Sequence, residues 1–205
     1  MIADSWSMAD QYSSKSKLCA AISTEAMGPD ADDLTLMQTF ANFSISYWGA
    51  DFCNNGFYNT EALKDPLRWD VNSRSWRYQT CDQVSYFNTA PKSGSLRSTV
   101  VDMDYHLTQC EAIFGKKMFP TSVEMTKVYG GEFPTANNVF YSDFSDDPWL
   151  RASVNYPVSS SQPFNLAMCN DCGHCYDLHT PSDNDPDAIK QTRSEFETYL
   201  WEWLQ

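Results

Sequence analysis

An acid and a base stand on two late loops of this chain, each after a short β-prone run. Asp147 ends an acidic loop, and His174 lies in a Cys-rich loop ahead of the C-terminal helical segment. An imidazole can take a proton from a nucleophile and return it to the leaving group. A carboxylate beside it fixes the tautomer and stabilises the imidazolium. The pair therefore indicates nucleophilic hydrolysis, although single Asp and His residues on loops are more often plain surface residues.

Other carboxylates nearby leave the choice of acid open on chemistry alone. Asp143 and Asp146 precede Asp147 in the same loop and are alternatives for the acid. Asp177 follows His174 by three residues, and we interpret it as a carboxylate that stabilises the loop.

Three cysteines surround His174 in residues 169–175, which contain two overlapping C-x-x-C steps. Thiolates and an imidazole can bind zinc, and the spacing is similar to part of an iron–sulfur motif. A second C-x-x-C pair at zinc-finger distance is missing, so we expect disulfides and no metal or other cofactor. Cys81 and Cys110 are the best single candidates for a disulfide, although spacing alone does not fix the pairing. The cysteine count of seven is odd, so one thiol is free or pairs outside this chain.

The pattern of apolar residues predicts the elements that carry these loops. Short β-prone runs over residues 138–142 and 163–168 precede the Asp and His loops. A final helix is expected from Asp185, a suitable N-cap, through Pro186 in the first turn to Leu204. Residues 51–75 are loop-like. Earlier and central helices are predicted by helical periodicity over residues 16–27, 30–43, 101–114 and 121–128.

Composition excludes several classes of protein. Of the 205 residues, 42% are hydrophobic and 15% aromatic, which suits a packed core. A net charge of −13 disfavours nucleic-acid binding. No apolar run is long enough to predict a membrane span, and the first residues do not form a signal-peptide pattern. The cysteines and the sequon Asn42–Ser44 indicate an oxidising compartment, which would require an N-terminus upstream of Met1.

Short motifs, among them those that contain Asp147 and His174, occur along most of the chain from about Arg74 onward. In chain order they are R-x-W-x-Y-Q-T-C at Arg74–Cys81, Tyr86-Phe87, Cys110 with Phe114-Gly115, Tyr129-Gly130-Gly131, Asn138-Val139, D-P-W at Asp147–Trp149, G-x-H-C-x-D-L at Gly173–Leu178, and Asp185-Pro186 with Arg193 and Trp203-Leu204. Each motif is weak, but the ordered set is specific. The set resembles the serine peptidase family that contains lysosomal Pro-X carboxypeptidase, dipeptidyl peptidase II and thymus-specific serine protease.

The resemblance implies roles for the site residues. Asp147 is implied as the triad acid and His174 as its base. Trp149 is implied to border a substrate pocket that favours proline at the cleavage point, where a flat indole suits a flat pyrrolidine ring; plain core packing is an equal alternative. The expected partner is a peptide with proline near its cleaved end, and the expected location is secreted or lysosomal/vacuolar.

The fold implied is α/β, the C-terminal part of an α/β-hydrolase with a helical cap. Residues 1–128 resemble the cap, and residues 129–205 resemble the last strands and terminal helix of the hydrolase core. Strand, acid loop, strand, His loop and helix follow the order in which that fold carries its acid and base.

The match lacks the nucleophile. No G-x-S-x-G elbow is recognisable, and the nearest serines, in residues 93–97, lack its glycines. Without a nucleophile no acyl-enzyme forms, so this chain alone is expected to be inactive. An N-terminal half or a second chain would supply the Ser. The present chain would then be a divergent homologue, a partial gene product or one piece of a processed enzyme. Asp143-Phe144 and Gln83 also stand where the family has Asn-Gly and Glu.

Three functions therefore remain open. The first is a serine-type exopeptidase, acting from either peptide end. The second is a catalytically inactive homologue that serves as a binding module. The third is a Cys-rich metal-binding module.

Overall fold

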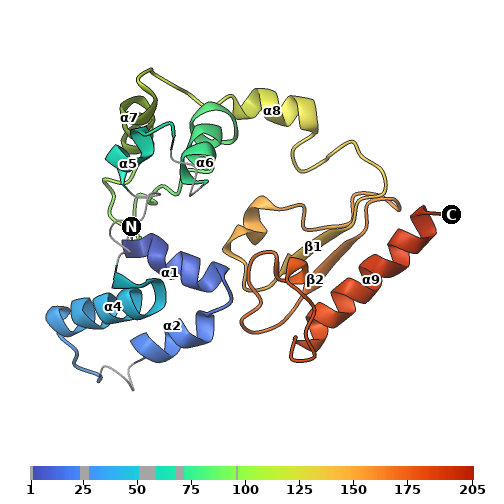
Figure 1. Ribbon diagram of the computed structural model, residues 1–205, viewed down its shortest axis with the longest axis horizontal. Helices are drawn as coiled ribbons and strands as arrows, with labels where there is room; N and C mark the ends of the chain where they lie inside the picture. Colours follow the sequence, from blue (N-terminus) through green and yellow to red (C-terminus); the bar gives the residue numbers. More distant parts are fainter. Residues whose placement is uncertain (1, 24–27, 51–58, 68–71, 96) are drawn as a thin grey trace. The chain divides into compact units, whose positions relative to one another are not determined.

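The computed structural model describes residues 2–23, 28–50, 59–67, 72–95 and 97–205. These residues form two compact units, described separately below. One unit contains residues 48–131, and the other contains residues 2–47 together with residues 132–205 (Figure 1). Cys53 and Leu96 lie outside the described residues.

The second unit contains a short parallel sheet with a helix against it. Strands β1 (Tyr141–Phe144) and β2 (Phe164–Ala167) pair in register from Tyr141 opposite Phe164 to Phe144 opposite Ala167. Helix α9 (Asp187–Trp203) contacts β2. The predicted runs at 138–142 and 163–168 thus correspond to these strands, with β1 shifted towards the acid loop.

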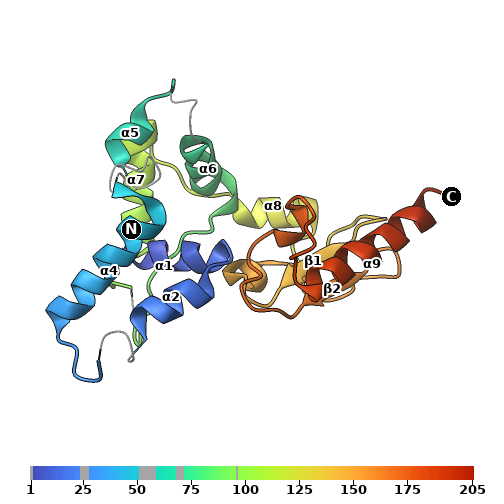
Figure 2. The ribbon, with the colours of Figure 1, turned by 60° about the horizontal axis from the view of Figure 1, so that its bottom comes forward.

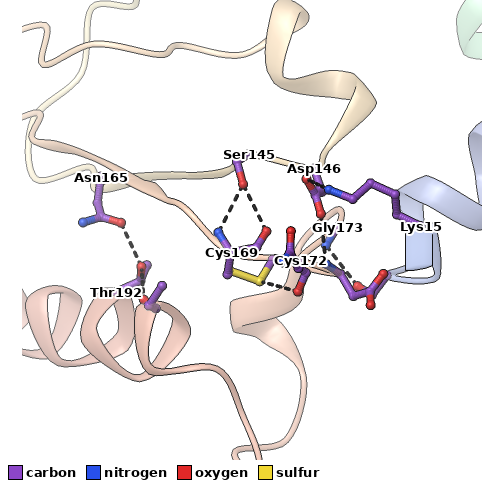
Figure 3. Close-up of a disulfide and its surroundings, with 12 residues drawn as sticks. Lys15, Ser145, Asp146, Asn165, Cys169, Cys172, Gly173 and Thr192 are labelled. Atoms are coloured by element: carbon purple, nitrogen blue, oxygen red, sulfur yellow. Dashed lines mark hydrogen bonds and ion pairs between the residues drawn. A yellow bond between two sulfur atoms is a disulfide. The ribbon is translucent and has the colours of Figure 1, made fainter. Parts of the chain in front are cut away.

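The core between the sheet and α9 is small and apolar. Phe144, Ala167, Cys172 and Ile189 are buried together. Thr192 is also buried, and its hydroxyl donates to the Asn165 side chain of β2 at 2.8 Å, as drawn in Figure 3. Because β1 and β2 end at the same edge, the loops that follow them leave the sheet side by side.

Helices from the beginning of the chain belong to this same unit. They are α1 (Ile2–Gln11), α2 (Lys15–Ile22) and α4 (Asp33–Trp48). Ala9, Leu18 and Phe43 form their buried cluster. Helix α1 contacts the 3-10 segment η3 (Pro148–Ala152), and both views place the α1–α2 turn beside that segment (Figures 1 and 2).

Residues 2–47 lie in the same unit as the strands. Hydrogen bonds from the α1–α2 turn to the loops after β1 and β2 connect them.

The first unit is helical. It contains α5 (Thr60–Lys64), α6 (Ser73–Gln79), a π-helical turn η2 (Thr80–Val84), α7 (Met103–Phe114) and α8 (Ser122–Tyr129). Helices α7 and α8 match their predicted ranges closely. Helix α5 and the start of α6 fall in residues 51–75, where the sequence predicted loop; the Asn59 side chain caps α5 by accepting from the backbone of Ala62.

A disulfide holds this helical unit together. Cys81 of η2 and Cys110 of α7 are bonded across 29 residues, and both are fully buried. The same pair was the leading candidate from the sequence. Helix α7 is well bounded, since Asp102 accepts from Tyr105 N at 2.9 Å and Gly115 ends it at φ 70°.

None of the helices described is both long and apolar enough to cross a bilayer.

Candidate active site

Asp147 is the N-cap of the 3-10 segment η3. Its Oδ1 accepts a hydrogen bond from the backbone N–H of Trp149 at 2.8 Å, and Pro148 occupies the first position of the segment. The backbone N–H of Asp147 donates to the carbonyl of Phe144, the last residue of β1. The Asp-Pro-Trp triplet therefore fixes the carboxylate locally, immediately after the strand.

His174 lies on the loop after β2 and meets this carboxylate. Its Nδ1 is 2.7 Å from Oδ2 of Asp147. The Asp147 side chain is 6% exposed, whereas that of His174 is 38% exposed. With Nδ1 engaged by the acid, Nε2 is the ring nitrogen left to exchange a proton with another group.

Trp149 lies beside the imidazole. The centroids of the indole and imidazole rings are 6.3 Å apart, and their planes are inclined by 44°. The indole Nε1–H donates to Oε1 of Gln11 at 2.9 Å. The three residues expected at the site are therefore brought together by the structure.

Asp146, the alternative acid, has different partners. Its Oδ1 accepts from Nζ of Lys15 at 2.6 Å (Figure 3). Its Oδ2 accepts from the backbone N–H of Asp171 at 2.9 Å. The hydrogen bond to Asp146 raises the pKa of the Lys15 amine. Asp146 thus ties the loop after β1 to the loop after β2.

Asp143 is the other alternative, and it is buried at the end of β1. Its Oδ1 accepts from the Ser153 hydroxyl at 2.7 Å, and its Oδ2 is buried with no hydrogen-bond partner among the described residues. Burial raises the pKa of this carboxyl, with a further contribution from the charge of Asp147. Asp177, expected to stabilise the loop, accepts from the Ser142 hydroxyl at 2.7 Å.

The cysteines next to His174 are partly paired. Cys169 and Cys172 form a disulfide (Figure 3), while Cys175 is an exposed free thiol. Partial desolvation of its sulfur and the nearby carboxylate of Asp177 raise the pKa of the Cys175 thiol. A metal module would need Cys169 and Cys172 as free ligands, and the described residues contain no group of three or more acidic, His or Cys side chains able to hold an ion.

Three residues of the α1–α2 turn reach the site: Gln11, Ser13 and Lys15. Sequence reasoning did not identify them. They are ordinary polar residues more than 130 positions from their partners, as the separation of 138 residues between Gln11 and Trp149 illustrates. No local spacing in the sequence indicates that these three residues lie near the site.

The chain matches a known protein family over most of its length. A family model described as serine carboxypeptidase S28 matches residues 5–196. A probable serine protease EDA2 of Arabidopsis thaliana is 28% identical over 218 aligned positions, covering all of this chain and 44% of the relative.

Two further relatives match shorter stretches. The thymus-specific serine protease of Mus musculus is 27% identical across 69% of this chain and 28% of the relative. A probable extracellular serine carboxypeptidase of Arthroderma benhamiae is 26% identical across 76% of this chain and 23% of the relative. The chain thus spans less than half the length of each of these curated relatives.

Proposed function

This chain belongs to the serine carboxypeptidase S28 family, and we propose that its Asp147–His174 pair is the acid and base of a serine-type exopeptidase. The 2.7 Å contact between His174 Nδ1 and Asp147 Oδ2 is the observation that carries the proposal. A buried carboxylate behind a more exposed imidazole is the arrangement that general-base activation of a nucleophile requires.

In this mechanism the Nε2 atom of His174 takes the proton of a Ser hydroxyl as its oxygen attacks the peptide carbonyl. The imidazolium, stabilised by Asp147, then gives the proton to the leaving amine, and an acyl-enzyme remains. Water, activated by the same Nε2, hydrolyses the ester and frees the Ser.

The Ser is expected from a segment beyond the printed 205 residues. The sequence contains no G-x-S-x-G elbow, and among the described residues no hydroxyl is hydrogen-bonded to His174. We therefore propose that this chain alone is inactive. A complete protein would be an α/β-hydrolase in which β1, β2 and α9 are late core elements and the helices before about residue 128 contribute a cap.

Trp149 is proposed to face the substrate residue next to the scissile bond. Its indole is half-buried and fixed by Asp147 at the backbone and Gln11 at Nε1. A fixed flat ring beside the base suits proline, whose ring stacks on an aromatic face at little cost in conformational entropy. The substrates would be peptides with proline near the cleaved end, and the enzyme would act in a secreted or lysosomal compartment.

An activity-based probe tests the proposal. A fluorophosphonate, which a nucleophilic Ser attacks with loss of fluoride, is expected to leave the 205-residue chain unlabelled. A longer protein that includes the missing elbow is expected to be labelled and to cleave proline-containing peptides. His174→Ala should abolish both signals, and His179→Ala, a change at a histidine outside the pair, should not. Labelling that survives His174→Ala would overturn the assignment.

The absence of a recognisable Ser also favours a second candidate, an inactive homologue that only binds peptides. That protein would bind proline-containing peptides through the Trp149 region without labelling or turnover, in the longer protein as well as in this chain.

A further inference from the structure

We infer that the turn between α1 and α2, residues 11–16, positions the Asp147–His174 pair, and that Gln11 is its central residue. The turn touches both the loop that carries the acid and the loop that carries the base. The contacts described below hold whatever the protein does; their consequence for catalysis rests on the proposed function.

Gln11 contacts both loops at once. Its backbone carbonyl accepts from the backbone N–H of His174 at 2.7 Å. Its side-chain Oε1 accepts from the indole Nε1–H of Trp149 at 2.9 Å. Gln11 thereby holds the backbone of His174 and the indole of Trp149, while the imidazole of His174 contacts Asp147.

Ser13 extends this contact by one residue. Its hydroxyl oxygen accepts from the backbone N–H of Gly173 at 3.0 Å. A Cβ atom on Gly173 would collide with the carbonyl of Gln11 and would lie 2.9 Å from the backbone nitrogen of Ser13. Glycine is therefore needed before His174 because the loop backbone lies directly on the turn.

The end of the turn joins the two loops through charged groups. Lys15 pairs with Asp146 at 2.6 Å, with 35% of the Lys15 side chain and 10% of the Asp146 side chain exposed. Asp146 also accepts from Asp171 N, and the Asp171 carboxylate accepts from the backbone N–H of Ser16 at 2.8 Å. Turn, acid loop and base loop thus form a closed ring of hydrogen bonds (Figure 3 shows Lys15, Asp146 and Gly173).

These contacts fix position without supplying chemistry. Removing one leaves Asp147 and His174 in place as acid and base, but it lets the base loop move relative to the acid loop. Small displacements of a base cost rate more than binding, because the proton transfer needs a narrow geometry. Gln11 and Ser13 are accordingly positioning residues.

Substitutions at Gln11 and Ser13 test this directly in the 205-residue chain. Gln11→Met keeps the length of the side chain and removes the Oε1 acceptor. Ser13→Gly removes the hydroxyl and tolerates the φ of 62° at that position. Matched controls are Gln38→Met, on the exposed part of α4, and Ser85→Gly, at φ 64° in the other unit.

The readout is hydrogen exchange of the His174 Nδ1–H and the Trp149 Nε1–H, followed by nuclear magnetic resonance. The sequence has three histidines and seven tryptophans, so each proton is assigned by its absence in a His174→Ala or a Trp149→Phe variant. We expect exchange to accelerate by roughly 2–10-fold in both turn variants and to stay unchanged in the controls, as the loss of one hydrogen bond predicts. Unchanged exchange of both protons in Gln11→Met and Ser13→Gly overturns the inference. Circular dichroism checks that each variant is folded, and Gln11→Glu, which keeps an acceptor, should restore protection of the indole proton.

Kinetics in the longer, Ser-containing protein separate this inference from the proposed function. We expect Gln11→Met to lower kcat by about tenfold with little change in KM, because only the transition state needs the aligned base. Faster exchange together with an inactive wild-type enzyme would refute the peptidase and leave the positioning role standing. An active enzyme whose kcat is unaffected by Gln11→Met would refute the positioning role alone.

Discussion

The backbone N–H of Trp149 donates to Oδ1 of Asp147 at 2.8 Å, so the acid also anchors the aromatic residue two positions later. The other oxygen of Asp147 faces His174. One buried carboxylate therefore organises both the base and the ring proposed to meet the substrate. A change at Asp147 should affect proton transfer while leaving most of the surrounding fold in place.

Asp147→Asn is the sharpest test of the acid. The amide oxygen can still cap Trp149, but its NH2 group cannot accept from the imidazole, so the tautomer and the imidazolium lose their support. We expect kcat of the Ser-containing protein to fall by about 10⁴-fold, measured by steady-state hydrolysis of a proline-containing peptide. Asp187→Asn, at a side chain that is fully exposed on α9, is the matched control and should stay near wild type. A loss below tenfold at Asp147 would assign the acid elsewhere.

Asp143→Asn should stabilise the protein at neutral pH. Burial raises the pKa of Asp143 above its ordinary value of 3.8, so the folded state holds this proton more tightly than the unfolded state. Stability from this group is therefore present at low pH and is lost as pH rises through the folded pKa. Asparagine does not ionise, so the stability advantage of the variant over wild type should increase as pH rises above about 4.

Urea unfolding across a pH series measures the effect. We expect a gain on the order of 1 kcal/mol near pH 7, the cost of a buried oxygen without a partner. The groups that face Asp143 are Asp147, Asp177, His174 and the Ser153 hydroxyl, and all of them are unchanged in the variant. A variant that is less stable than wild type at every pH would show that the charged form of Asp143 is required by the fold.

The contact between Asp147 and His174, the proposed acid and base, was predictable because its signals are local. Asp147 is followed by Pro148, which starts a helical turn, and that turn is what fixes the carboxylate after β1. His174 follows the second β-prone run, and parallel strands bring the loops at their ends together. Both facts can be inferred from neighbouring residues in the sequence.

The support of the site was not predictable in the same way. Gln11 and Ser13 act through one carbonyl and two polar side-chain atoms across more than 130 residues, and neither has a periodic or charged pattern. The two overlapping C-x-x-C steps also left the pairing open. Cys172 is buried beside Phe144 and Ile189, whereas Cys175 is exposed, and this packing distinguishes the disulfide from its alternative.

Arg193→Met should loosen the far end of the base loop. The guanidinium donates to the carbonyls of Asp177 at 2.9 Å, Tyr176 at 3.2 Å and His179 at 3.0 Å, and it also pairs with Asp185. Methionine fills a similar volume and removes all of these donors. We expect the unit to lose about 2–3 kcal/mol for the three carbonyl contacts, measured by urea unfolding.

The control for Arg193 lies on the same helix. Lys190 is half-exposed; its Nζ donates to the Asp183 carbonyl at 2.7 Å and lies 3.9 Å from Asp187, so Lys190→Met should cost no more than about 1 kcal/mol. Limited proteolysis should also cut the Arg193→Met protein faster between residues 175 and 182. Equal stability of the two variants would mean that the arginine does not hold the loop.

The two disulfides should contribute unequally to stability. Cys81 and Cys110 close a loop of 29 residues, whereas Cys169 and Cys172 are 3 residues apart. Loop-closure entropy predicts losses of about 3.5 kcal/mol for Cys81→Ala with Cys110→Ala and about 2 kcal/mol for Cys169→Ala with Cys172→Ala. Denaturant unfolding without reductant measures both, and Cys19→Ala, at an exposed free thiol, should change stability by less than about 0.5 kcal/mol. Under reducing conditions each double variant should match wild type more closely, because the cross-link that it lacks is then absent from both proteins. A larger loss from the short loop than from the long one would contradict the entropic account and would place the main stabilisation of the chain in the loop of His174.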